Sequence, residues 1–291
     1  MARISDLKKA LKPMVDLFTI TGPKVYCQKD LKNILDDHRD QWHLAEEIGL
    51  QHFIKFAAKF VSLQPIKLSF PNRNEIRYIY GECSIHTIVQ SLRPKGYFSH
   101  RSAAEIHGLL DPNDQIFFNF EQSLRSQSLG EMTQDAIDRT FHNRARITQN
   151  KARYNDYTIW LLNGKNTDYY GVIQHDEGNN KSIRVTDIAR TLIDMAVRPD
   201  YSGGPVQILQ AYRKGLGVVD GHTLIKALVN LKHNYPYHQV VGFYMEKAGF
   251  NTEHLEPLRM LPMNFDFYLD YQMVDPLYSP TWRLYYPLFF G

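Results

Sequence analysis

Cysteine is scarce in this sequence, since Cys27 and Cys83 are the only two among 291 residues. Two thiols cannot build a disulfide framework, and so low a count is typical of a reducing compartment. No apolar run approaches the roughly 18 residues that span a bilayer, and the first residues lack the apolar core of a signal peptide. We therefore expect a soluble, cytoplasmic protein with no membrane partner.

A strong overall charge is also lacking, because 34 basic and 31 acidic residues leave a net charge of +3. The charge is unevenly distributed. Between Leu50 and Tyr80, five basic residues accompany one acid, Glu75, whereas residues 111–291 carry 18 basic and 20 acidic groups. The positive excess is therefore N-terminal, as expected of a region that contacts phosphate groups.

Sequence patterns that carry catalysis or bind metals are missing as well. No Cys-x-x-Cys or His-x-x-x-His pair occurs, and His100 and His107, with Glu105 nearby, are a weak metal candidate. No glycine pair is followed by the Gly-Lys-Ser/Thr of a phosphate-binding loop. We expect no catalytic residues, no bound metal and no cofactor, and hence a protein that is not an enzyme.

Apolar spacing predicts three helices and a hairpin in the N-terminal part. Apolar side chains recur every three or four residues over Ile4–Phe18, Gln28–Arg39 and Leu50–Val61, the spacing of a helix. Ile66–Phe70 and Ile76–Tyr80 read as strands joined by a turn. Three helices followed by a two-stranded hairpin is the element order of a winged helix-turn-helix domain.

We assign this winged helix-turn-helix to residues 1–80 and expect it to bind DNA. A recognition helix needs polar and basic groups opposite its core stripe, and a wing needs a basic tip. The expected DNA-binding residues of the third helix and the hairpin are Gln51, His52, Lys55, Lys59, Lys67, Arg73 and Arg77. The same residues would also suit a solvated helix with an ordinary hairpin, or a winged helix that docks a protein.

Residues 81–291 mix strand-like and helical segments, so the sequence predicts an α+β protein with a mixed C-terminal domain. The strand-like segments are Ile116–Phe120, Arg139–Ile147, Thr158–Leu162 and Tyr169–Ile173. Helices are expected over Ile188–Val197, Pro205–Lys214, Thr223–Leu231 and Tyr237–Ala248, with Ser99 capping a shorter one. Residues 122–138 are expected to form a loop with a short helix, and the tail from Leu255 to be irregular.

A second basic cluster contains no acid and consists of Arg139, Arg144, Arg146, Lys151 and Arg153. It could form a secondary basic surface that extends phosphate binding. It could equally be the exposed face of one strand and a loop, or a docking surface for an acidic partner.

Two segments carry a resemblance to a known family. Tyr97–Leu109 has a Ser-His pair before an Ala-containing helix that ends in His-Gly-Leu, and Val185–Gly204 has an Arg-Thr-Leu-x-Asp helix before a Pro…Gly-Gly turn. Both resemble segments of the AbiEi family of bacterial antitoxins and transcriptional regulators. The sequence departs from the family pattern in a longer N-terminal domain, with an insertion-like stretch at Asp36–Gly49. The tail motif Tyr278–Pro287 has no role that the residues reveal.

The resemblance implies a DNA-binding transcriptional repressor and antitoxin of a type IV toxin–antitoxin system in phage defence, with residues 81–291 as the antitoxin domain. Such a protein autoregulates its operon and counters a nucleotidyltransferase-like toxin, without requiring a stable complex. Its partners would be double-stranded operator DNA and that toxin. Repeated operator sites would suit a homodimer or cooperative binding.

Two other functions stay open on the sequence alone. One is a protein-interaction module of a bacterial defence complex that does not bind DNA. The other is a metal-dependent nuclease with a winged-helix appendage, in which Asp266 and Asp270, with Asp194, would hold the metal.

Overall fold

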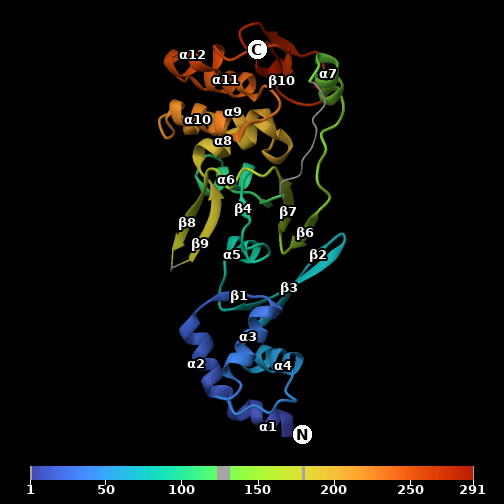
Figure 1. Cartoon of the computed structure of the whole chain (residues 1–291), viewed down its shortest axis with the longest axis vertical. Helices are drawn as coiled ribbons and strands as arrows, with labels where there is room; N and C mark the ends of the chain where they lie inside the picture. The colour runs from blue at the N-terminus through green and yellow to red at the C-terminus, as the bar shows by residue number, and fades with distance from the viewer. Residues whose placement is uncertain (1, 123–131, 179–180, 291) are drawn as a thin grey trace. The chain divides into compact units, whose positions relative to one another are not determined.

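The computed structural model describes residues 2–122, 132–178 and 181–290 of a mixed α+β protein (Figure 1), which confirms the predicted class. The chain divides into two compact units. The first comprises Met1–Lys95 with Ala152–Asn155 and Asp176–Ile183. The second comprises Gly96–Lys151, Asp156–His175 and Arg184–Gly291. None of the described helices is long and apolar enough to cross a membrane.

Helices build most of the first unit: α1 (Ala2–Lys9), α2 (Leu11–Thr21), α3 (Gln28–His38), α4 (Leu50–Phe60) and α5 (Ile85–Gln90). The helices predicted over 28–39 and 50–61 are confirmed to within one residue. The helix predicted over 4–18 is instead two helices that meet at Ala10. Pro13 explains the break, because its ring nitrogen cannot donate to the carbonyl of Lys9 and proline is tolerated only in a first turn.

The sheet of the first unit has three antiparallel strands in the order β1-β3-β2, namely β1 (Lys24–Tyr26), β2 (Gln64–Phe70) and β3 (Arg73–Tyr80). Both predicted hairpin strands are present. The sequence analysis missed β1, because three residues are too few to show a period of two. Its pairing with the end of β3, Tyr26 opposite Tyr78, places it beside strands that lie far along the chain.

The insertion-like stretch before α4 packs into the core of the first unit. Trp42, Leu44 and Ile48 are buried there, in the same apolar cluster as Phe53 of α4. The guanidinium of Arg39 donates to the carbonyl oxygens of Ala45 (2.7 Å) and Ile48 (3.1 Å). These contacts hold the chain that leads into α4, and therefore set how α4 sits on its own unit.

A six-stranded mixed sheet in the order β6-β7-β5-β4-β9-β8 forms the centre of the C-terminal part. Its strands are β4 (Tyr97–Phe98), β5 (Gln115–Glu121), β6 (Lys151–Tyr154), β7 (Tyr157–Gly164), β8 (Val172–Gly178) and β9 (Lys181–Thr186). The central pairs β5–β7 and β4–β9 are parallel, whereas β4–β5 is antiparallel.

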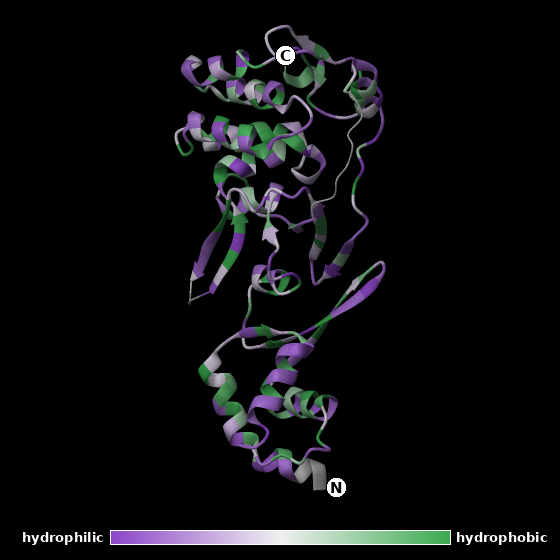
Figure 2. Ribbon diagram, viewed as in Figure 1, coloured by the Kyte–Doolittle hydropathy of each residue, from purple (hydrophilic) through white to green (hydrophobic). Residues whose placement is uncertain are grey.

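The second unit contains α7 (Gln134–His142), described below, and six further helices: α6 (His100–Ile106), α8 (Ile188–Val197), α9 (Pro205–Gly215), α10 (Gly221–Leu231), α11 (Tyr237–Ala248) and α12 (Thr252–Arg259). The predicted helices over 188–248 are confirmed. Their buried residues form one large apolar core. Figure 2 shows hydrophobic and polar positions interleaved along these helices, and α8 and α11 are buried over most of their residues.

The strand predicted at Arg139–Ile147 is wrong, because this stretch begins inside α7 (Gln134–His142). Ile137 and Phe141 lie four residues apart and are both buried, and Thr133 caps the helix by accepting from the amide of Ala136 (3.3 Å). Part of the loop predicted at 122–138 lies outside the described residues. The strand predicted at Tyr169–Ile173 is mostly a turn, because β8 begins only at Val172.

The tail predicted to be irregular contains α12 and a second small sheet in the order β10-β12-β11. Its strands are β10 (Phe267–Tyr268), β11 (Leu277–Ser279) and β12 (Leu284–Tyr286), followed by a 3₁₀ turn, η2 (Leu288–Phe290). Strands of two or three residues leave no periodic signal. They form because Phe267, Trp282 and Leu284 are buried in the core of the second unit.

Candidate nucleic-acid interface

One face of α4 presents the polar and basic side chains expected of a recognition helix. Phe53, Phe56 and Ala57 point into the core of the first unit and are buried. The opposite face carries four exposed predicted residues, Gln51, His52, Lys55 and Lys59. No acidic residue lies within α4. The exposed face of α4 therefore carries two ammonium groups and two polar side chains, and α4 itself contains no acidic side chain.

The hairpin β2–β3 distributes its three predicted basic residues over two faces. Lys67 lies opposite Ile76 in the strand register, whereas Arg73 and Arg77 share the other face with Phe70 and Ile66, their respective cross-strand partners. Lys67 and Arg73 are exposed. The Arg73 guanidinium lies over the ring of Phe70, 5.5 Å from its centre. These two cations are therefore accessible at the hairpin, on opposite sides of it.

Arg77 is not at the surface, although the sequence analysis grouped it with the exposed basic residues. Its side chain is buried, with 7% of the residue exposed. The guanidinium donates to the carbonyl oxygens of Ser91 (3.2 Å) and Ile76 (2.8 Å), and to the Glu75 carboxylate (3.3 Å). These bonds make Arg77 a structural residue of the first unit, so it does not belong to the accessible surface.

Glu75 is the one acid of the hairpin, and arginines compensate its charge. Its carboxylate accepts from Arg73 (2.8 Å), Arg93 (3.1 Å) and Arg77 (3.3 Å). Burial favours the neutral form of Glu75, but the hydrogen bonds from Arg73 and Arg93, with the charges of Arg93 and Arg77, lower its pKa overall. The hairpin consequently has no unpaired negative charge that would repel a phosphate backbone.

The second basic cluster does not form one continuous element. Arg139 lies on α7, Arg144 and Arg146 follow it in an extended connection, and Lys151 and Arg153 lie on β6; all five are exposed. The Lys151 ammonium lies 4.4 Å from the ring centre of Trp160. Arg146 is distinct from the others because it also lines a cavity of the second unit.

The weak metal candidates have other partners. His100 Nδ1 is hydrogen-bonded to Ser99 Oγ (2.7 Å); Ser99 takes the N-cap position of α6, as predicted, but its side chain makes no capping hydrogen bond. His107 Nε2 donates to the carbonyl oxygen of Thr186 (2.6 Å), and Glu105 pairs with Arg101 (2.7 Å).

Two of the three acids of the nuclease hypothesis pair with arginines, and the third, Asp270, accepts from the amide of Tyr271 (2.8 Å). Asp194 pairs with Arg190 (3.4 Å) and Asp266 with Arg283 (2.8 Å). Within residues 2–122, 132–178 and 181–290, no group of three or more His, Cys, Asp or Glu side chains is placed to hold a metal ion.

The Arg-Thr-Leu-x-Asp helix is α8, and its arginine joins distant parts of the second unit. Arg190 is almost fully buried. Besides Asp194, it donates to the hydroxyl groups of Tyr97 (2.9 Å) and Thr167 (2.8 Å), and it lies 3.9 Å from a Glu121 oxygen. Asp194 follows Arg190 by four residues, so the two lie on one helix face and can pair. The other partners could not be found from spacing, since they lie on β4, β5 and the connection after β7.

No protein-family model and no curated protein matches this sequence. Among the solved structures that are similar is the crystal structure of the RV2827C protein from Mycobacterium tuberculosis. It has 12% sequence identity and a TM-score of 0.60, over 97% of this chain and 91% of that chain. At this identity the likeness establishes a shared fold over nearly the whole chain, and nothing about function.

Proposed function

We propose that the first unit is a winged helix that binds double-stranded DNA, and that the protein is a transcriptional repressor. The element order supports this proposal, with helices α2, α3 and α4 preceding the hairpin β2–β3 and a short third strand completing the sheet. In this arrangement α4 is the recognition helix and the β2–β3 hairpin is the wing.

The observation that carries the proposal is the set of exposed cations on α4, Lys55 and Lys59, and on the two sides of the wing, Lys67 and Arg73. Gln51 and His52 lie at the N-terminal end of α4, where a recognition helix reads base edges. The four cations would neutralise backbone phosphates and release counterions, which makes affinity depend on salt. Arg77 is excluded from this surface by its burial.

We further propose that the repressor is the antitoxin of a type IV system, a role that rests on the AbiEi-like segments. Both segments lie in the second unit and form its interior: α6 contributes buried Ala103 and Ala104, and α8 contributes buried Arg190. The second unit would then be the part that counters a nucleotidyltransferase-like toxin. Co-expression of the full chain with that toxin tests this role, because the full chain should restore growth if the proposal holds.

DNA binding is tested by a gel-shift titration of the full chain on its own upstream DNA at two salt concentrations, beside a scrambled duplex. We expect tight, salt-sensitive binding that prefers the upstream sequence. The triple variant Lys55→Ala, Lys59→Ala, Arg73→Ala should lose this binding and keep its fold, because all three side chains are exposed.

A matched control replaces three exposed cations of the second unit, Arg213, Lys214 and Lys226, by alanine. It removes the same charge and should bind as the parent does. If the control and the triple variant lose affinity equally, the effect is one of net charge and the α4 surface is not the interface. If the parent shows no DNA binding at either salt concentration, the first unit is a protein-docking module.

A further inference from the structure

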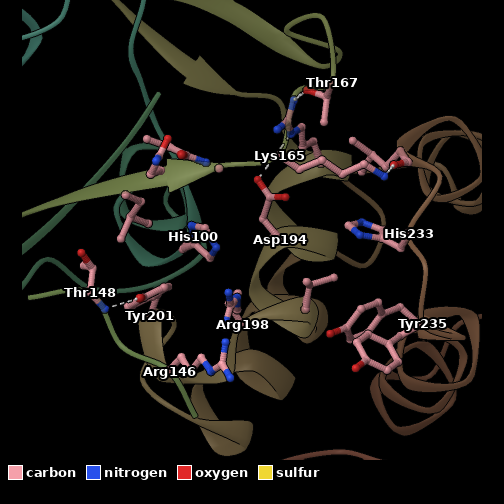
Figure 3. A pocket seen from close by; sticks show the side chains of 18 of the residues that line it. His100, Arg146, Thr148, Lys165, Thr167, Asp194, Arg198, Tyr201, His233 and Tyr235 are labelled. Atoms are coloured by element: carbon pink, nitrogen blue, oxygen red, sulfur yellow. Dashed lines mark hydrogen bonds and ion pairs between the residues drawn. The ribbon is translucent and has the colours of Figure 1, made fainter. Parts of the chain in front are cut away.

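A cavity of about 560 Å³ lies inside the second unit, far along the chain from the α4 surface. Its lining comes from the start of α6, the connection before β6, the end of β7 and the C-terminal end of α8, together with the chain between α10 and α11. Figure 3 shows His100 and Tyr201 on one side and His233 and Tyr235 on the other, with Asp194 and Arg198 between them. Its size is that of a small-molecule site.

Positive charge dominates the lining of this cavity. Arg146, Lys165, Arg190 and Arg198 line it, and Asp194 is the one carboxylate among the lining residues. Four cations and one anion leave a net +3. Asp194 is already committed to Arg190, which also lies beside Glu121. The excess charge therefore belongs to Arg146, Lys165 and Arg198.

These three cations have no carboxylate partner within 4.0 Å in the described part of the chain. Lys165 donates to the carbonyl oxygens of Leu231 (3.3 Å) and Lys232, which place its ammonium at the cavity. An anion that enters the cavity would therefore meet an excess of positive charge in its lining.

Two buried polar atoms of the lining lack a hydrogen-bond partner among the described residues. One is Oδ1 of Asn119, whose residue is only 6% exposed, and the other is Nε2 of His233. The Asn119 amide nitrogen donates to the Tyr97 hydroxyl (3.3 Å), and the amide group as a whole packs against Gly164. Unsatisfied buried polar atoms cost free energy, so these atoms point to a ligand that completes their bonds.

The pKa values of the two histidines of the lining are lowered by burial and by the positive charges around them. Burial, with the charges of Arg198 and Arg190, lowers the pKa of His100 to about 3. Burial, with the charges of Lys165 and Arg190, lowers the pKa of His233 to about 4. Both rings are therefore neutral at pH 7. They can accept or donate one hydrogen bond to a ligand without adding to the charge.

Aromatic rings form the remaining wall, with Tyr201, Tyr235, Tyr237 and Tyr271 all lining the cavity. Tyr201 is held in place because its hydroxyl accepts from the amide of Thr148 (2.8 Å). Tyr235 is only partly buried, and its ring contacts those of Phe141, Tyr237 and Phe267.

We propose that this cavity binds a small phosphate-bearing molecule of mononucleotide type. Arg146, Lys165 and Arg198 hold the phosphate, and the tyrosine wall receives the base. The unpaired Asn119 oxygen accepts from a donor on the sugar or the base. This site is separate from the proposed DNA surface and does not depend on it.

Calorimetric titration of the full chain tests the site, with pyrophosphate, the four ribonucleoside monophosphates, ATP and adenosine as probes. We expect at least one phosphorylated probe to bind with a submillimolar Kd and adenosine not to bind. Arg146→Ala and Arg198→Ala should each weaken binding about tenfold or more, the loss of a charge-assisted hydrogen bond. Arg144→Ala is the matched control, because Arg144 is exposed two residues from Arg146 and does not line the cavity.

A second variant separates the phosphate from the base. Tyr235→Ala should weaken binding of the monophosphate and leave the affinity for pyrophosphate unchanged. The proposal is overturned if none of the phosphorylated probes binds at a probe concentration of about 1 mM, which corresponds to a binding free energy of only about −4 kcal/mol. It is also overturned if Arg146→Ala and Arg198→Ala bind as tightly as Arg144→Ala.

Discussion

The indole ring of Trp282 lies directly against the backbone of Gly242 in α11, where a Cβ atom would be 2.2 Å from indole Cζ3. The indole Nε1 donates to a Glu246 carboxylate oxygen (2.7 Å), and the Gln239 amide donates to the Trp282 carbonyl oxygen (2.8 Å). Three residues of α11 spaced by three or four thus hold one tryptophan. The tail motif is a strap that closes the core of the second unit.

Gly242→Ala should therefore destabilise the protein, although alanine is the better helix former. Overpacking a fully buried contact costs about 1–3 kcal/mol, which exceeds the roughly 1 kcal/mol gained in helix propensity. The midpoint of urea denaturation measures the effect. Gly49→Ala is the control, since a Cβ there meets nothing within 4 Å. Equal stability of the Gly242→Ala variant and the parent would show that Trp282 does not pack here.

Arg77→Met should lower the stability of the first unit and leave the DNA surface intact. The change removes the donors to the Ser91 carbonyl oxygen and one partner of Glu75, a loss of about 1–3 kcal/mol. Lys55→Ala should change stability by less than about 0.5 kcal/mol, because that side chain is exposed. Denaturation midpoints and DNA affinity are measured for both. If Arg77→Met keeps full stability and loses DNA binding, Arg77 reaches DNA and its burial is not maintained in solution.

The steepness with which DNA affinity falls with salt concentration should reflect the number of cations that contact phosphates in the proposed interface. Each phosphate contact contributes about 0.9 to the slope of log affinity against log salt concentration. The variant lacking Lys55, Lys59 and Arg73 should therefore have a slope smaller by about 2 to 3. Affinities at several salt concentrations give this slope. An unchanged slope with weaker binding would mean that these residues support the fold of the site without contacting phosphate.

Acid should destabilise the second unit through His233. Its pKa is about 4 when folded and 6.5 when unperturbed, so the unfolded chain binds more protons between these values. Burying the neutral ring therefore carries no penalty above pH 6.5. As the pH falls below 6.5 the folded state loses stability relative to the unfolded chain, and this loss is about 2 kcal/mol at pH 5. Asp270 acts in the opposite sense, because burial raises its pKa to about 6.

A comparison of the parent with His233→Gln isolates the histidine, since Asp270 is common to both. The variant should lose less stability than the parent between pH 7 and pH 5, as measured by urea denaturation at each pH. Identical losses in the two proteins would indicate that His233 is solvated and titrates normally when folded.

Local periodicity predicted the helices well, because a helix is set by contacts among residues three and four apart. The predicted bounds of Tyr237–Ala248 and Ile188–Val197 match α11 and α8. The exposed face of α4 followed for the same reason, as its core stripe determines which side faces water. Short strands such as β1 were missed, because pairing with a distant segment, and not their own three residues, makes them strands.

The sequence by itself determined the α+β class, the main helices, the N-terminal excess of basic residues and the Arg190–Asp194 pair. Only the tertiary structure decided that Arg77 is buried while Arg73 is exposed, although both lie on one strand and one face. It also decided that Arg146 lines a cavity with Arg198 and His233. Burial and the charge around a site depend on segments that are distant along the chain, and local spacing carries no information about which segments meet.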